Sequence, residues 1–131
     1  MFPKKLMTDV IWGFYGGQYE SREKLIQAVT DYNKNFGKKW SPNKIVLSCT
    51  SITIQYFYWN EKEDDDVEEN FNLTADKESG FTAEELLFKI HNQVVDKLEN
   101  EDYHFFEGLT LWEGENFENP NAPFYFLNQG S

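Results

Sequence analysis

The residues with the greatest capacity for chemistry or recognition are carboxylates crowded between positions 61 and 69. The acidic residues of this run are Glu61, Glu63, Asp64, Asp65, Asp66, Glu68 and Glu69. The three aspartates are consecutive and no glycine follows until Gly80, whereas a calcium-binding loop alternates its ligands around a central glycine. We therefore expect no metal here. A solvated hairpin tip or a docking surface for a basic partner fits better, because clustered carboxylates attract positively charged surfaces and raise association rates by about 10–10³-fold.

The acidic run belongs to a charge asymmetry between the two halves of the chain. Residues 1–60 contain eight Lys or Arg and four Asp or Glu, a net charge of +4, whereas residues 61–131 contain four Lys and nineteen Asp or Glu, a net charge of −15. The whole chain has a net charge of −11, which opposes binding to a nucleic acid. We therefore do not expect a nucleic-acid partner, although lysines cluster near the end of the first predicted helix, at Lys34, Lys38, Lys39 and Lys44.

A second candidate surface lies near the C-terminus, where aromatic rings are interspersed with glutamates over residues 104–131. Most of these rings must belong to the core, but those beside acids in or near a long loop are candidates for exposure. Trp and Tyr are favoured at the energetic centres of protein interfaces. We therefore expect a protein partner to contact the acidic run together with Trp112, Glu113, Glu115 and Phe117.

The side chains available for a catalytic group are Cys49, His91 and His104. Cys49 is the only cysteine, so neither an intramolecular disulfide nor a CxxC metal pair is possible, as is typical of a reducing compartment. His91 falls beside the apolar face of a predicted helix, which is typical of a hydrogen-bonded core histidine. The glycines of residues 13–17 match neither a phosphate-binding loop nor a dinucleotide-binding fingerprint. We expect no catalytic residue, no metal and no cofactor, and a protein that is not an enzyme.

Two helices are predicted to position these residues. The first spans 22–36, follows the N-cap Ser21, and has apolar residues at helical spacing along one face. The second spans 83–99 and follows Thr82, which begins a capping box of the Thr-Ala-Glu-Glu type. Its apolar residues recur every four positions from Leu86 onward, which is the strongest periodic signal in the chain.

Strands are predicted from runs of β-branched and aromatic residues at 8–15 (a strand or an extended arm), 45–47, 52–59, 71–75, 105–112 and 124–127. The segments 45–47 and 52–59 are either two strands or one long bulged strand. The acidic run would form a hairpin loop over 60–70, and the stretch 113–123, which contains Gly and Pro, a second loop. This order predicts a single α+β domain over residues 1–131, in which two helices cover one face of a mainly antiparallel sheet.

The N-terminal segment does not have the pattern of a signal peptide. The apolar stretch after Lys4 and Lys5 is interrupted by Asp9 and by glycines. No segment approaches the ~20 apolar residues that a membrane-spanning helix requires. We therefore expect a cytoplasmic protein without a membrane partner.

A small, acidic, aromatic-rich α+β chain without a catalytic motif resembles the immunity proteins that bacteria encode beside polymorphic or contact-dependent growth-inhibition toxins. The resemblance concerns the general character of the whole chain, including the segments YHFFEGLTLWEG and APFYFLNQGS, and transfers no functional residue. It implies a protein that binds and blocks its cognate toxin. Many such toxins are nucleases with basic active sites, which an acidic inhibitor complements in charge. The alternatives are a protein-binding adaptor or regulatory module of another system and, after that, a small-molecule enzyme.

Overall fold

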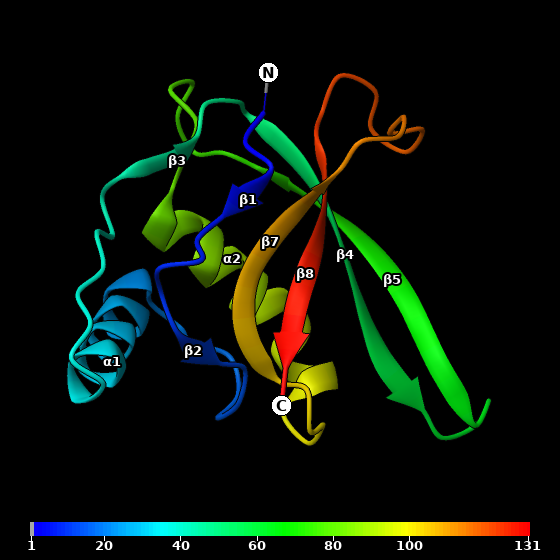
Figure 1. Ribbon diagram of the computed structural model, residues 1–131, viewed down its shortest axis with the longest axis horizontal. Helices are drawn as coiled ribbons and strands as arrows, with labels where there is room; N and C mark the ends of the chain where they lie inside the picture. The colour runs from blue at the N-terminus through cyan, green and yellow to red at the C-terminus, as the bar shows by residue number, and fades with distance from the viewer. Residues whose placement is uncertain (1) are drawn as a thin grey trace.

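Figure 1 shows the computed structural model, which describes residues 2–131. The described residues form two helices, α1 (Arg22–Asn35) and α2 (Ala83–Leu98), and eight strands. The strands are β1 (Lys5–Leu6), β2 (Trp12–Gly13), β3 (Ile45–Leu47), β4 (Ser51–Asn60), β5 (Asp65–Thr74), β6 (Phe81–Thr82), β7 (Phe105–Trp112) and β8 (Phe124–Gly130). The predicted α+β class is confirmed, because the two helices accompany a mainly antiparallel sheet.

Both helices begin at the predicted caps. The Ser21 hydroxyl accepts a hydrogen bond from the N–H of Lys24 (3.2 Å), and the Thr82 hydroxyl accepts one from the N–H of Glu85 (3.3 Å). These bonds satisfy N–H groups that have no partner within the first turn of a helix. Both predicted helices are confirmed, and each ends one residue earlier than expected. The apolar stripe of α2 is fully buried and consists of Leu86, Ile90, Val94 and Leu98.

The main sheet has the strand order β1-β7-β8-β4-β5, and β2 also pairs with β7. All of its pairs are antiparallel except β4 with β8, which is parallel. The two edges of this sheet differ. The edge at β7 is covered by β1 and β2, which pair with its two ends through Lys5↔Thr110 and Trp12↔Phe106. The opposite edge is the ten-residue strand β5. β3 and β6 form a separate two-stranded sheet.

The main sheet has an inner face against the helices and an outer face without one. Figure 1 shows α2 behind the strands, with α1 beside it. Ile52 and Ile54 of β4 are buried in the same core cluster as the apolar side chains of α2. Further along β4, the ammonium of Lys97 in α2 lies 4.7 Å from the ring centre of Tyr58. Because side chains alternate along a strand, the intervening residues, such as Gln55, point to the outer face.

The hairpin loop predicted over 60–70 is wrong. β5 begins at Asp65, and only residues 61–64 turn between β4 and β5. The ladder continues through ten residue pairs, from Ser51↔Thr74 to Asn60↔Asp65. β4 contains no charged residue, so every acid of β5 faces an uncharged side chain across the ladder. Like charges are therefore not directly opposed, and the acidic segment is compatible with a strand.

Three other strand predictions are corrected or refined. Of the segment 8–15, predicted to be a strand or an extended arm, only Trp12–Gly13 forms a strand of the sheet, and the unpredicted β1 precedes it. The segments 45–47 and 52–59 are two strands, because β3 and β4 belong to different sheets. β6 was not predicted, since a two-residue strand is too short to show alternation. β7 has the predicted bounds, and β8 continues three residues beyond its predicted end.

Candidate partner-binding site

The outer face of the main sheet contains a groove of about 500 Å³. Its floor includes Phe124 and Phe126 of β8 and Gln55 of β4, which the parallel pairing of these strands brings side by side. Its walls come from β5, from the end of β7 and from the loop 113–123. The residues that line this groove, here called the acidic groove, are Gln55, Glu68, Asn70, Trp112, Glu115, Asn116, Phe117, Glu118, Phe124 and Phe126.

The aromatic rings of the acidic groove are held by one another. Trp112 meets Phe124 edge-on, with ring centres 5.1 Å apart and an interplanar angle of 64°, and Phe124 meets Phe126 at 5.6 Å and 72°. Such edge-to-face pairs are the favoured geometry for aromatic side chains. Gly114 lies directly against the Trp112 indole, so a Cβ at this position would clash with Cζ2 of the ring. A fixed indole that is 39% exposed remains available to a partner.

Asparagines fasten the loop 113–123 to the edge of the groove. The Asn116 amide donates to the Thr53 hydroxyl (2.9 Å), and the Asn119 amide donates to the Ser51 hydroxyl (2.6 Å). A third contact runs from the Asn70 amide of β5 to a carboxylate oxygen of Glu118 (2.9 Å). These bonds tie the loop to β4 and β5 and present its acids beside the aromatic floor. At the tip of the loop, Phe117 is 81% exposed.

The structure brings together four of the predicted partner-binding residues. Glu68 from β5 lines the acidic groove with Trp112, Glu115 and Phe117, although 44 positions separate Glu68 from Trp112 in the chain. Asp66 lines an adjoining hollow of about 300 Å³, which shares Glu68 with the groove. Both acids lie on the outer face, because they alternate with the inward residues of β5. Asp66 and Glu68 of the acidic run therefore form one continuous surface with Trp112, Glu115 and Phe117.

Five of the other predicted residues lie outside this surface, whereas Glu113 lines another hollow, of about 380 Å³, that shares Trp112 and Phe124 with the acidic groove. Glu61, Glu63 and Asp64 occupy the turn at the tip of the hairpin. Asp65 and Glu69 pair in register with Asn60 and Tyr56, so their side chains point to the inner side of the ladder. Glu113 lies 3.8 Å from the ammonium of Lys4, and both side chains are largely exposed, so this ion pair contributes little stability.

A half-buried phenol, that of Tyr103, lies next to the acidic residues of the hollow. The Tyr103 hydroxyl donates to Asp66 (3.3 Å), and its ring packs on Phe57 at a centroid distance of 4.7 Å. Burial, with the nearby carboxylates of Glu101 and Asp66, raises the pKa of Tyr103 to about 12. Tyr103 therefore stays neutral at physiological pH and does not add to the negative charge of this face.

Comparison with known proteins does not assign this chain to a family. No protein-family model, curated protein or solved structure matches it. Among residues 2–131, no group of three or more His, Cys, Asp or Glu side chains is arranged to hold a metal ion. Neither helix in this described part combines the length and the apolar character that crossing a membrane requires.

Several residues of the acidic groove were not predicted from the sequence. They include Phe124 and Phe126, which the sequence places in a strand without indicating the face to which they point. Asn70 and Glu118 were also missed. The two-residue spacing of Asp66, Glu68 and Asn70 would have placed Asn70 on the same face, but only if the strand had been extended into the acidic run. Oδ1 of Asn70 is buried without a hydrogen-bond partner among the described residues.

The candidate catalytic side chains are not assembled into one group. His91 is fully buried: its Nδ1 accepts from the indole N–H of Trp12 (3.0 Å), and its Nε2 donates to the carbonyl of Gly17 (2.8 Å). This confirms the prediction of a hydrogen-bonded core histidine. His104 donates through Nδ1 to the carbonyl of Glu101 (2.5 Å).

Cys49 likewise has a local partner. Its thiol donates to the carbonyl of Ser51 (3.2 Å). Burial raises the pKa of the Cys49 thiol, which disfavours the nucleophilic thiolate. Within residues 2–131, no hydrogen bond joins Cys49 to either histidine.

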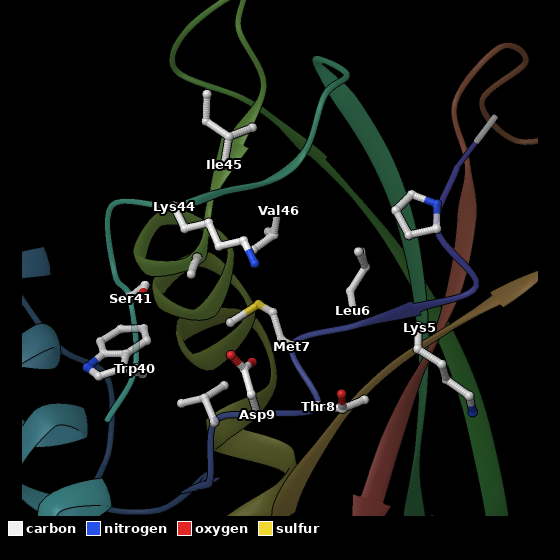
Figure 2. A pocket seen from close by; sticks show the side chains of 13 residues that line it. Lys5, Leu6, Met7, Thr8, Asp9, Trp40, Ser41, Lys44, Ile45 and Val46 are labelled. Atoms are coloured by element: carbon white, nitrogen blue, oxygen red, sulfur yellow. The ribbon is translucent and has the colours of Figure 1, made fainter. Parts of the chain in front are cut away.

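A second cavity, of about 340 Å³, lies between β1 and the segment 40–46. Figure 2 shows Lys44 and Asp9 extending into it from opposite walls, with Met7 between them. Its wall also includes apolar and aromatic side chains such as Trp40. The cavity combines charges of both signs and makes no continuous surface with the acidic groove. It therefore lacks the single-sign charge that would select a basic or an acidic partner.

Proposed function

We propose that this chain is a non-enzymatic, cytoplasmic immunity protein that binds a cognate toxin domain and blocks it. The observation that carries the proposal is the acidic groove, in which exposed aromatic rings and carboxylates share the one sheet face that no helix covers. Aromatic side chains supply binding energy at interface centres, and charged rims steer association and select the partner. This combination suits a toxin with a basic surface, such as the substrate-binding surface of a nuclease.

The proposed inhibition is steric and electrostatic. Glu68, Glu115 and Glu118 would face lysines or arginines that the toxin uses to hold phosphates, while Trp112 and Phe117 bury apolar surface beside them. A toxin covered in this way cannot admit its own polyanionic substrate. The same groove would also serve an adaptor that binds a basic protein of another system, which remains the second candidate function.

Co-expression tests the proposal. The chain is produced with the toxin domain encoded directly upstream of its gene, and growth is measured against a strain that expresses the toxin alone. We expect full growth with the wild type. The triple variant Glu68→Gln, Glu115→Gln, Glu118→Gln should protect less, because it removes three charges from the acidic groove.

The matched control places the same loss of charge in the hairpin turn: Glu61→Gln, Glu63→Gln and Asp64→Asn. These residues lie outside the acidic groove, so we expect protection close to that of the wild type. If the toxin kills at full expression of the wild-type chain, the immunity function is wrong. If both triple variants lose protection equally, net charge and not the groove carries recognition.

A further inference from the structure

The hydrogen-bonding direction of β4 determines which groups of β5 are free. The N–H of Thr53 donates to the carbonyl of Pro123 (3.0 Å), and the N–H of Phe57 donates to the side chain of Gln129 (3.0 Å). The odd-numbered residues of β4 therefore direct their backbone groups toward β8. In an antiparallel ladder, alternate residues bond to opposite sides, so the even-numbered residues of β4 bond to β5.

The register then identifies the free groups of β5. Ile52, Ile54 and Tyr56 pair with Leu73, Phe71 and Glu69, so these odd-numbered residues of β5 use their N–H and C=O groups toward β4. The even-numbered residues direct theirs away from the sheet. Within residues 2–131, no backbone group pairs with the outward N–H or C=O of Glu68, Asn70 or Asn72. Figure 1 shows β5 as the outermost strand on that side.

One side chain of this molecule already uses the free edge. The ammonium of Lys89 donates to the carbonyl of Thr74 at 2.7 Å, at the end of β5 near the helices. Thr74 is even-numbered, so its carbonyl is one of the backbone groups of β5 that point away from the sheet. A lysine can therefore reach the outward carbonyls of β5 while pairing with neighbouring carboxylates, as Lys89 does with Asp76 (2.9 Å).

The residues with free backbone groups are also those whose side chains face the acidic groove. Glu68 and Asn70 line the groove, and Asp66 lines the adjoining hollow. A chain that paired with β5 would extend the sheet by one strand and lay every second side chain on the outer face. Its backbone and its outward side chains would thus meet the edge and the groove in a single binding event.

We propose that the segment of the partner that occupies the acidic groove is an extended basic chain that pairs with β5 as an added strand. This inference rests on the proposed function for the existence of a basic partner and specifies how that partner is bound. Strand addition to an exposed edge obtains affinity from main-chain hydrogen bonds and selectivity from alternate side chains. Here the alternate side chains would be Lys or Arg opposite Asp66 and Glu68.

Charge selects this occupant over a second copy of the same chain. If two β5 strands paired, the acidic half of each strand, residues 65–69, would lie near the carboxylates of the other strand or opposite residues that do not neutralise its negative charge. Charged side chains on an edge strand are a common means of preventing self-association. The carboxylates that repel a second β5 strand attract a basic strand. They therefore exclude a second copy of this chain and favour a basic partner.

The experiment uses a blocked nonapeptide of alternating lysine and threonine as the probe, at low salt. Hydrogen exchange of the amides of Glu68, Asn70 and Asn72 is followed by NMR, and affinity is measured by calorimetry. We expect all three amides to become protected. In an added strand that runs antiparallel to β5 with its lysines over the groove, the lysine N–H groups point toward β5. A peptide N-methylated at its lysines should therefore lose most of its affinity, whereas one N-methylated at its threonines should keep it.

A protein variant provides an independent readout. Glu68→Pro removes an outward N–H, and proline is tolerated on an edge strand where its nitrogen faces solvent. Its matched control is Glu68→Ala, which removes the same carboxylate and keeps the N–H. We expect Glu68→Pro to bind the peptide about tenfold more weakly than Glu68→Ala, for the loss of one backbone hydrogen bond. If Glu68→Pro fails to fold, the two methylated peptides and the exchange data on the wild type decide the question.

The outcomes separate this inference from the proposed function. Equal affinity of the two methylated peptides, without protection of the three amides, overturns strand pairing while leaving the acidic groove as the binding surface. Absence of any binding by the unmodified peptide also overturns strand pairing. In either case the co-expression experiment decides the immunity function separately.

Discussion

The buried histidine gives a quantitative prediction about stability and pH. His91 is fully buried, and it accepts the indole N–H of Trp12 through Nδ1 while donating through Nε2 to Gly17. The indole nitrogen is a donor only, so the bond to Trp12 requires Nδ1 to be unprotonated. Protonation would place an N–H against another N–H inside the core. Burial accordingly lowers the pKa of His91 from its ordinary value of 6.5, although its bond to Gly17 acts in the opposite direction.

The sign of the effect follows from proton binding. Below the ordinary pKa of 6.5, His91 in the unfolded chain binds a proton that the folded protein does not, so acid favours unfolding. Stability is therefore fully present above that pH and falls as pH decreases toward the folded pKa. One proton changes the free energy of unfolding by about 1.36 kcal/mol per pH unit. Since half of the unfolded chains are already protonated at pH 6.5, the loss of stability from pH 6.5 to pH 5.0 is at most about 1.6 kcal/mol.

Urea unfolding between pH 7 and pH 5 measures this slope. The comparison variant is His91→Gln, which cannot be protonated and retains His104. We expect His91→Gln to be less stable than the wild type at pH 7 and to have a smaller change in stability toward pH 5. Identical pH dependence of the two proteins would refute the assignment of a neutral, buried His91. We expect partner binding to be unchanged, since His91 lies on the helix side of the sheet.

Three further predictions concern the acidic groove and the thiol. Association with the basic partner should slow as salt rises, because the Debye length shrinks from about 10 Å at 0.1 M to about 3 Å at 1 M. In stopped-flow experiments, Glu115→Gln should lower mainly the association rate, whereas Trp112→Ala should raise the dissociation rate; salt-independent association would contradict this view. Gly114→Ala should displace the Trp112 ring, change its near-ultraviolet circular dichroism and cost about 1 kcal/mol of stability in urea; an unchanged spectrum would contradict that contact. Cys49→Ala should cost about 1 kcal/mol and leave partner binding intact, and a loss of function at unchanged stability would reopen a chemical role for the thiol.

The helices were predictable because their signals are local. Ser21 and Thr82 cap the helices where the sequence places them, and the four-residue apolar spacing of α2 is the stripe that becomes buried. Both signals involve residues within a turn or two of one another. Neither requires knowledge of the rest of the fold.

The start of β5 was not predictable in the same way, because its stability depends on its neighbour. Residues 65–69 contain four acids, which alone indicates a solvated loop. Their pairing with the uncharged strand β4 makes the segment a strand, and this pairing appears only in the three-dimensional register. The error in the loop also concealed which acids share a face. Glu68 could be named as a candidate from the sequence. That it lies on the opposite face of β5 from Asp65 and Glu69 could not be predicted.

Part of the charge asymmetry along the sequence becomes a separation in space. Lys34 lies in α1, and Lys38 and Lys39 follow it, whereas the acids of 61–69 lie on the β4–β5 hairpin; Figure 1 shows α1 and this hairpin on opposite sides of the molecule along its longest axis. A protein with separated charges of opposite sign has a field that turns an approaching charged partner. A basic partner is attracted to the hairpin and repelled from the end of α1. The basic first half of the chain, which the resemblance to immunity proteins did not explain, would thus help to orient the partner toward the acidic groove.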